Sequence, residues 1–144
     1  MLATLARHGL CVTGDTVEVT DLAGAQAQFV LDPLIDAHLG KVVTAENDVA
    51  VALNTAFMGD GALIRIAAGA GIDRPLNLVF IAAGDKPAAM FTRSLVVVEN
   101  GARAMIVESH ESAGNPDYQV NTVFELVVGD DAHVVGDEHD RGVE

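Results

Sequence analysis

The chain has 144 residues, a hydrophobic fraction of 50% and a formal net charge of −13. This length indicates one domain that can bury a substantial core. With no Trp and one Tyr, that core must consist mainly of Val, Ile, Leu and Ala. The acidic charge argues against binding to nucleic acid, whose phosphates require Lys and Arg, and against binding to an anionic membrane surface.

The cysteine content and the N-terminus indicate the compartment. Cys11 is the only cysteine, so no internal disulfide is possible, which suits a reducing environment. The N-terminal residues show no signal-peptide pattern. These features predict a cytoplasmic protein.

The first third of the chain predicts one short strand followed by two short helices. Residues Gly14–Leu22 have the alternation of a strand. Asp32 and Pro33 can begin a helix that Gly40 ends. Asn47 can cap a second helix, which Gly59 ends.

The second expected helix, Asp48–Met58, carries its apolar residues on one stripe. These residues are Val49, Leu53, Ala56 and Phe57. We expect this helix to cover the outer apolar face of the strands that follow.

From Gly61 onward the pattern is that of strands. Ala62–Ala68 and Leu76–Ala83 are near-continuous apolar runs, and four more apolar segments follow, at 94–99, 102–110, 120–129 and 132–135. Continuous apolar strands are expected where both faces of a sheet are covered. Short strands, Gly-rich corners and few aromatic residues favour the stacked rungs of a parallel β-helix. The alternative is an antiparallel sandwich, because the Asn-Gly turn at 100–101 is a hairpin signal.

A weak repeat accompanies these strands. Val97–Ala104 matches Val127–Val134 in pattern, and Phe57–Ile64 carries a similar Asp-Gly-Ala kernel. Gly69 and Gly71 do not form a dinucleotide-binding motif, because Arg74 stands where the third glycine is needed. We expect both glycines to turn a corner with positive φ.

Candidate metal ligands are few. Glu108 and His110 are two residues apart in an expected strand, so they project to the same face, and His133 could join them from a neighbouring rung. A competent site needs three or four ligands with supporting hydrogen bonds. A single pair near a loop is more typical of a solvated edge. We therefore expect no metal site.

No catalytic or cofactor-binding residue is expected elsewhere. Cys11 beside His8 is interpreted as a small buried residue. The C-terminal carboxylates are interpreted as a solvated acidic end, with weak binding of a divalent cation as the alternative. They are Asp130, Asp131, Asp137, Glu138 and Asp140.

Three ordered segments carry a family resemblance. Leu53–Gly61, Pro75–Phe80 and Arg93–Glu108 resemble, in this order, the sequence series of the SufB/SufD family of iron–sulfur cluster assembly components. The resemblance covers roughly residues 15–135. It implies a right-handed parallel β-helix, preceded by a short strand and two short helices.

The resemblance also implies how the chain is divided. Residues 1–58 would form an N-terminal α/β lead-in and capping region, and residues 59–144 the start of the β-helix core with an acidic C-terminal end. The interior of the first coil would be lined by apolar residues of the first two apolar runs. They are Leu63 or Ile64, Ile66, Leu76, Leu78 and Phe80.

The function implied by the resemblance is that of a scaffold without catalysis of its own. The amino-acid sequences of these segments are more similar to SufD than to SufB. The chain would be a fragment of a subunit whose partners are a SufB-like protein and a SufC-like ATPase. It would bind no cofactor itself, while the full complex handles an iron–sulfur cluster. An exposed last rung would also promote self-association.

Two alternatives remain open. The first is a β-helix enzyme acting on polysaccharide, for which Glu108, Glu111 and Arg103 are the candidate residues. The second is a small metal-binding β protein of the cupin kind, although the chain has no His-x-His pair.

Overall fold

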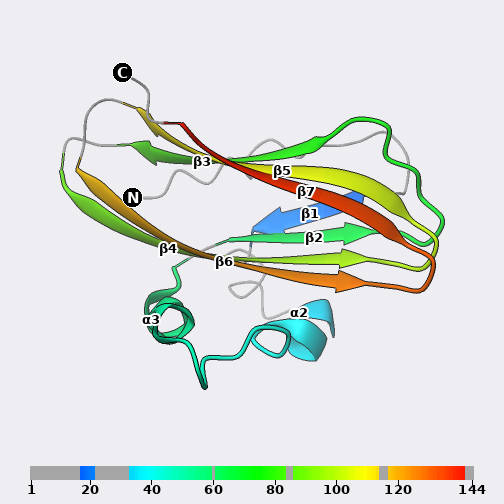
Figure 1. The fold of residues 1–144 in the computed structure, drawn as a ribbon, viewed down its shortest axis with the longest axis horizontal. Coiled ribbons are helices and arrows are strands. Elements are labelled where there is room, and N and C mark those ends of the chain that lie inside the picture. Colours follow the sequence, from blue (N-terminus) through cyan, green and yellow to red (C-terminus); the bar gives the residue numbers. More distant parts are fainter. Residues whose placement is uncertain (1–16, 22–32, 60, 84–85, 114–116, 142–144) are drawn as a thin grey trace.

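The computed structural model describes residues 17–21, 33–59, 61–83, 86–113 and 117–141 (Figure 1). Within these residues the protein is mainly β, as expected. The elements are β1 (Val17–Asp21), α2 (Pro33–His38), α3 (Val49–Phe57), β2 (Ala62–Ile66), β3 (Leu76–Ala83), β4 (Ala88–Val98), β5 (Arg103–Ala113), β6 (Tyr118–Val128) and β7 (His133–Arg141). Neither helix is long and apolar enough to span a membrane.

The strands form two sheets. Sheet A has the order β1-β2-β4-β6, and sheet B has the order β3-β5-β7. From β3 onward, each strand therefore lies in the sheet opposite to the strand before it, and from β4 onward it pairs in parallel with the strand two earlier. Only β1 pairs antiparallel, with β2. The alternative of an antiparallel sandwich is wrong for these strands, since the Asn-Gly turn joins β4 to β5 in the other sheet.

The corners between the sheets repeat and stack. Val97–Ala104 lies beside Val127–Val134, as the sequence repeat predicts, with Val97 opposite Val127 and Arg103 opposite His133. The Gly69 amide donates to the Asn100 carbonyl oxygen at 2.9 Å, and the Gly101 amide donates to the Asp130 carbonyl oxygen at 2.8 Å. These bonds join each corner to the next.

Left-handed backbone recurs at one place in each corner. Gly69 has φ 71°, Gly101 has φ 70° and Asp131 has φ 57°. The expectation for Gly71 was wrong, because its φ is not positive. The proposed third copy at Phe57–Ile64 was also wrong. Ile64 pairs in mid-strand, and the corner that aligns with the other two is Ile66–Gly71.

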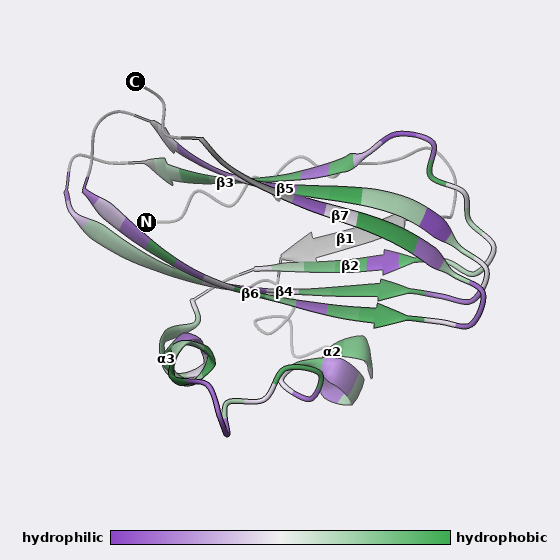
Figure 2. Ribbon diagram, in the orientation of Figure 1, coloured by the Kyte–Doolittle hydropathy of each residue, from purple (hydrophilic) through white to green (hydrophobic). Residues whose placement is uncertain are grey.

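An apolar core lies between the two sheets. Alternate residues of each strand point inward, and Figure 2 shows the corresponding hydrophobic colour along the strands. The buried members are Ile64, Ile66, Ala70, Leu76, Val96, Val98, Ala102, Ala104 and Ile106. Each buried Ile or Leu contributes roughly 1.5–3 kcal/mol. The sequence expectation was correct for Ile64, Ile66 and Leu76, whereas Leu63 belongs to the opposite face of sheet A.

The outer face of sheet A carries a second apolar cluster. Leu63, Leu95 and Val97 are buried there, and the side chains packed against them are Leu34, Ile35, Leu39 and Val127. The helix that covers this apolar face is therefore α2. The expectation for Asp48–Met58 was correct for the face, because α3 contacts β4 and β6 there, and wrong for the contact, because α3 does not pack on this apolar cluster.

Helix α3 begins one residue later than expected. Its N-cap is Asp48, not Asn47, and the Asp48 carboxylate accepts from the amides of Ala50 at 2.8 Å and Val51 at 3.2 Å. The apolar stripe of this helix faces solvent, because the sheet beneath α3 presents polar groups.

Candidate functional site

The outer face of sheet A holds a buried ion pair. Arg93 on β4 and Glu125 on β6 are 2% and 0% exposed, and Arg93 Nε lies 2.5 Å from Glu125 Oε1. The carboxylate also accepts hydrogen bonds from the backbone amides of the segment after α2. These amides belong to Gly40, Val42 and Val43. The charge of Glu125 is thus compensated on several sides, as a buried charge requires.

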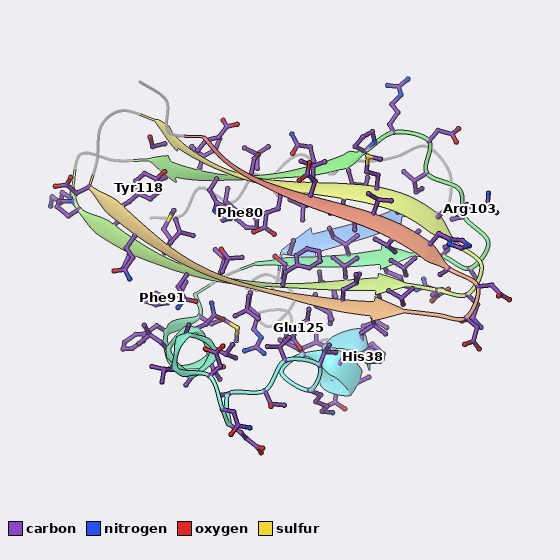
Figure 3. All side chains as sticks on the ribbon, in the orientation of Figure 1. His38, Phe80, Phe91, Arg103, Tyr118 and Glu125 are labelled. Atoms are coloured by element: carbon purple, nitrogen blue, oxygen red, sulfur yellow. The ribbon has the colours of Figure 1, made fainter. Side chains whose placement is uncertain are left out.

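The guanidinium of Arg93 reaches the same segment and α3. It donates to the Val43 carbonyl oxygen at 2.6 Å and to Thr55 Oγ1 at 2.8 Å. We refer to Arg93, Glu125 and these partners as the Arg93–Glu125 clamp. Figure 3 shows Glu125 between sheet A and the helical segment. The clamp ties the two helices to the sheet.

A second polar contact fixes α3. Asn54 is completely buried, and its Nδ2 donates to the carbonyl oxygens of Thr92 at 2.8 Å and Asn121 at 2.9 Å. Asn121 in turn donates to the Ala50 carbonyl oxygen at 3.1 Å. No role was predicted for these asparagines from the sequence. The available signal was the half-polar face of β6, where Asn121 and Glu125 alternate with valines.

The pair Glu108 and His110 lies in the interior. Their exposed fractions are 6% and 4%, and Glu108 Oε1 lies 2.8 Å from His110 Nε2. His110 stacks on Phe80 at 5.2 Å between ring centroids, and its Nε2 lies 3.4 Å from Thr122 Oγ1 across the two sheets. The interpretation as a solvated edge was wrong, since both side chains are buried between the sheets and hydrogen-bond each other.

The structure does not bring His133 to this pair. His133 is paired with Arg103, which precedes Glu108 by five positions on β5, a separation of about 16 Å along the strand. Within the described part of the chain, no three His, Cys, Asp or Glu residues are grouped so that they could hold a metal ion. Glu108 and His110 alone supply two potential ligands.

The other candidate sets are also spread out. Arg103 is exposed at one end of β5, and Glu111 projects to the face of β5 opposite Glu108, so these three residues do not converge as a glycosidase would need. Asp130 and Asp131 lie at a corner, whereas Asp137 lies along β7. The side chains of Glu138 and Asp140 lie outside the described ones, as do Cys11 and His8.

A corner carries one further ion pair. Arg65 Nε lies 2.7 Å from Glu99 Oε1, and the Ala68 amide donates to Glu99 Oε2 at 3.0 Å. The hydrogen bond from Arg65, followed by that from Ala68, lowers the pKa of Glu99. Both side chains are about one-third exposed, so this pair organises a corner at the surface.

A cavity of about 400 Å³ lies between the sheets at the last strands of the stack. Most of its walls are apolar, and Glu108 and Thr122 also reach it. The lining residues are Ile106, Glu108, Thr122, Phe124, Leu126, Val134, Gly136 and Asp137. Among the described strands, β6 pairs only with β4 and β7 only with β5. Within the described strands, the cavity therefore lies beside the outermost strands of both sheets, β6 and β7.

The fold defines a class of protein in which parallel strands alternate between two sheets. Two family models match the chain. The model described as the SufBD protein N-terminal region matches residues 14–78, and the model described as SUF system FeS cluster assembly, SufBD core domain, matches residues 80–136. The two matches meet within β3. The chain belongs to the SufB/SufD family, as the sequence resemblance predicted.

Two curated relatives come from Synechocystis sp. The chain is 34% identical over 134 residues to the iron–sulfur cluster assembly SufBD family protein slr0076. This match covers 85% of the present chain and 28% of the relative. It is 31% identical over 123 residues to the SufBD family protein slr0074, covering 76% of this chain and 25% of the relative. The chain thus matches about a quarter of the length of these relatives.

Proposed function

We propose that the chain serves iron–sulfur cluster assembly as a scaffold of the SufD type, without catalysis of its own. The observation that carries this proposal is the stack of corners, in which Gly69, Gly101 and Asp131 occupy the same place in successive turns. We interpret the two sheets as the first turns of a right-handed parallel β-helix. Such a stack is lengthened by adding strands beside β6 and β7, which suits a framework.

The chemistry of the buried charges supports a structural role. Arg93 and Glu125 bond each other and the backbone of the helical segment. Glu108 and His110 bond each other in the interior. Buried polar side chains that are paired in this way favour one arrangement of the chain. The cluster would be the cargo of the complete complex, with no part of it held by this chain.

The proposed partners are a SufB-like subunit and a SufC-like ATPase, in the cytoplasm. The strand edges of β6 and β7 and the cavity between them offer a surface on which further strands can add, so self-association of this chain belongs to the same proposal.

The test is co-purification with the candidate partners. Tagged chain is expressed with the SufB-like and SufC-like subunits of its own organism, and the material retained by the tag is analysed by mass spectrometry. We expect both subunits to be retained with the chain and lost when the outer edge of β6 is blocked by Val128→Pro, whose amide points away from β4. Retention of neither subunit by the wild-type chain would overturn the proposal.

A further inference from the structure

Helix α3 binds the sheet through its polar side and exposes its apolar side. Val49, Leu53 and Phe57 follow one another at one-turn spacing, and their exposed fractions are 86%, 39% and 62%. We call these three residues the α3 stripe. In Figures 1 and 2, α3 lies on the outer side of sheet A, away from the interior between the sheets.

The orientation of α3 is fixed by hydrogen bonds. The Asn54 side chain donates to the carbonyl oxygens of Thr92 and Asn121. The Asn121 side chain donates to the Ala50 carbonyl oxygen, and Arg93 donates to Thr55 Oγ1. A rotation that buried the α3 stripe would break all of these bonds and leave polar groups of the sheet unsatisfied. The exposure of the stripe is therefore built into the contact between helix and sheet.

The stripe continues onto the sheet at its C-terminal end. The Phe57 ring lies 5.4 Å from the Phe91 ring of β4, at an interplanar angle of 35°. Phe91 is half-buried, so the aromatic pair is anchored on one side and open on the other. Exposed aromatic and branched side chains supported in this way are typical anchors of a recognition surface.

The charges around the stripe indicate what binds there. Helix α3, Val49–Phe57, contains no charged residue, whereas Glu46 and Asp48 are exposed just before it, in a chain of net charge −13. If two copies met through α3, the acidic residues beside the stripe would face each other and repel, so a second copy is a poor occupant of this surface. A basic partner is attracted instead.

We propose that the α3 stripe is the docking surface for an amphipathic helix of another polypeptide. The partner helix would place apolar side chains at one-turn spacing against Val49, Leu53 and Phe57, as in helix-to-groove recognition. Its flanks would carry Lys or Arg facing Glu46 and Asp48. The proposal does not depend on the part played by the chain in cluster assembly.

The test uses a defined probe and matched variants. A fluorescent 14-residue peptide of Leu and Lys, with the leucines on one helical stripe, is titrated with the full chain at 150 mM salt, and its anisotropy is recorded. The first control peptide has the same composition in an order that breaks the stripe. The second replaces each Lys with Glu. The protein variants are Val49→Ser with Leu53→Ser, and Met105→Ser on β5 as an exposed apolar control.

We expect micromolar binding of the Leu/Lys peptide, at least tenfold weaker binding of the Leu/Glu peptide, at least tenfold weaker binding of the Leu/Lys peptide to the double variant, and unchanged binding to Met105→Ser. Circular dichroism melting of each variant separates loss of the surface from loss of the fold. Three outcomes would overturn the proposal: equal binding of the reordered peptide, unchanged binding to the folded double variant, or dimerisation of the chain through the stripe without peptide binding.

Discussion

The two helices lie on the same face of sheet A but are held by opposite chemistry. Helix α2 packs Leu34 and Ile35 on a buried apolar cluster that includes Leu95. Helix α3 is held by the hydrogen bonds of Asn54 and by the Arg93–Glu125 clamp. Apolar contact is non-directional and leaves the polar side of α2 to solvent. Hydrogen bonds fix one orientation, and in α3 this leaves the apolar side exposed.

The largest expected loss in the free energy of unfolding comes from breaking the Arg93–Glu125 clamp. Glu125→Ala would leave Arg93 buried without its carboxylate and three backbone amides without their acceptor, which costs about 3–5 kcal/mol. The measurement is the free energy of unfolding from urea denaturation. The control is Arg93→Met combined with Glu125→Leu, which removes the uncompensated charge and should recover part of the loss, while the three amides still lack their acceptor. A full loss in this double variant would contradict a compensated ion pair.

Beneath α2, the free energy of unfolding should depend on the side-chain volume of Leu95. Leu95 is completely buried beneath α2, so Leu95→Ala should lower the free energy of unfolding by about 2–5 kcal/mol. Leu95→Met, which nearly conserves volume, should cost less than about 1.5 kcal/mol. If the two variants were equally destabilised, cavity formation would not be the cause.

Beneath α3, stability should depend on the hydrogen bonds that the Asn54 side chain donates. Asn54→Ala removes the donor that the carbonyl oxygens of Thr92 and Asn121 share, at a cost of about 1–3 kcal/mol. Amide hydrogen exchange should accelerate in α3 while α2 stays protected. Asn54→Leu is the sharper variant, because it adds apolar surface without a donor. Rescue by leucine would mean that α3 is held by apolar contact after all.

The smallest expected effect is a dependence on pH at one corner. The pKa of Glu99 is lowered, so its contribution is present above the ordinary pKa of Glu and is lost as the pH falls through the lowered value. Because the pair with Arg65 is partly exposed, the contribution is at most about 1 kcal/mol. Glu99→Gln should therefore differ from wild type at pH 7 and converge with it in acid. A constant difference across this range would contradict the assignment.

The parallel stack was accessible from the sequence, and the roles of the polar residues were not. Continuous apolar runs predicted strands covered on both faces, and the repeat at Val97–Ala104 predicted the stacked corners. The stripe on α3 was expected to face the sheet because apolar side chains usually face inward. That rule fails where the sheet itself presents donors and acceptors, as at Thr92 and Asn121. Glu108 was expected at a solvated edge because the same rule places charged side chains on the surface.

Register between β5 and β7 is the most direct test of the stack. In a chain with Cys11→Ser, the substitutions Arg103→Cys and His133→Cys place two thiols on directly paired residues of neighbouring strands. The account predicts near-complete disulfide formation under mild oxidation. In a meander of hairpins, β6 would separate these strands and hold the thiols about 10 Å apart. Absence of the cross-link in the folded protein would contradict the parallel stack.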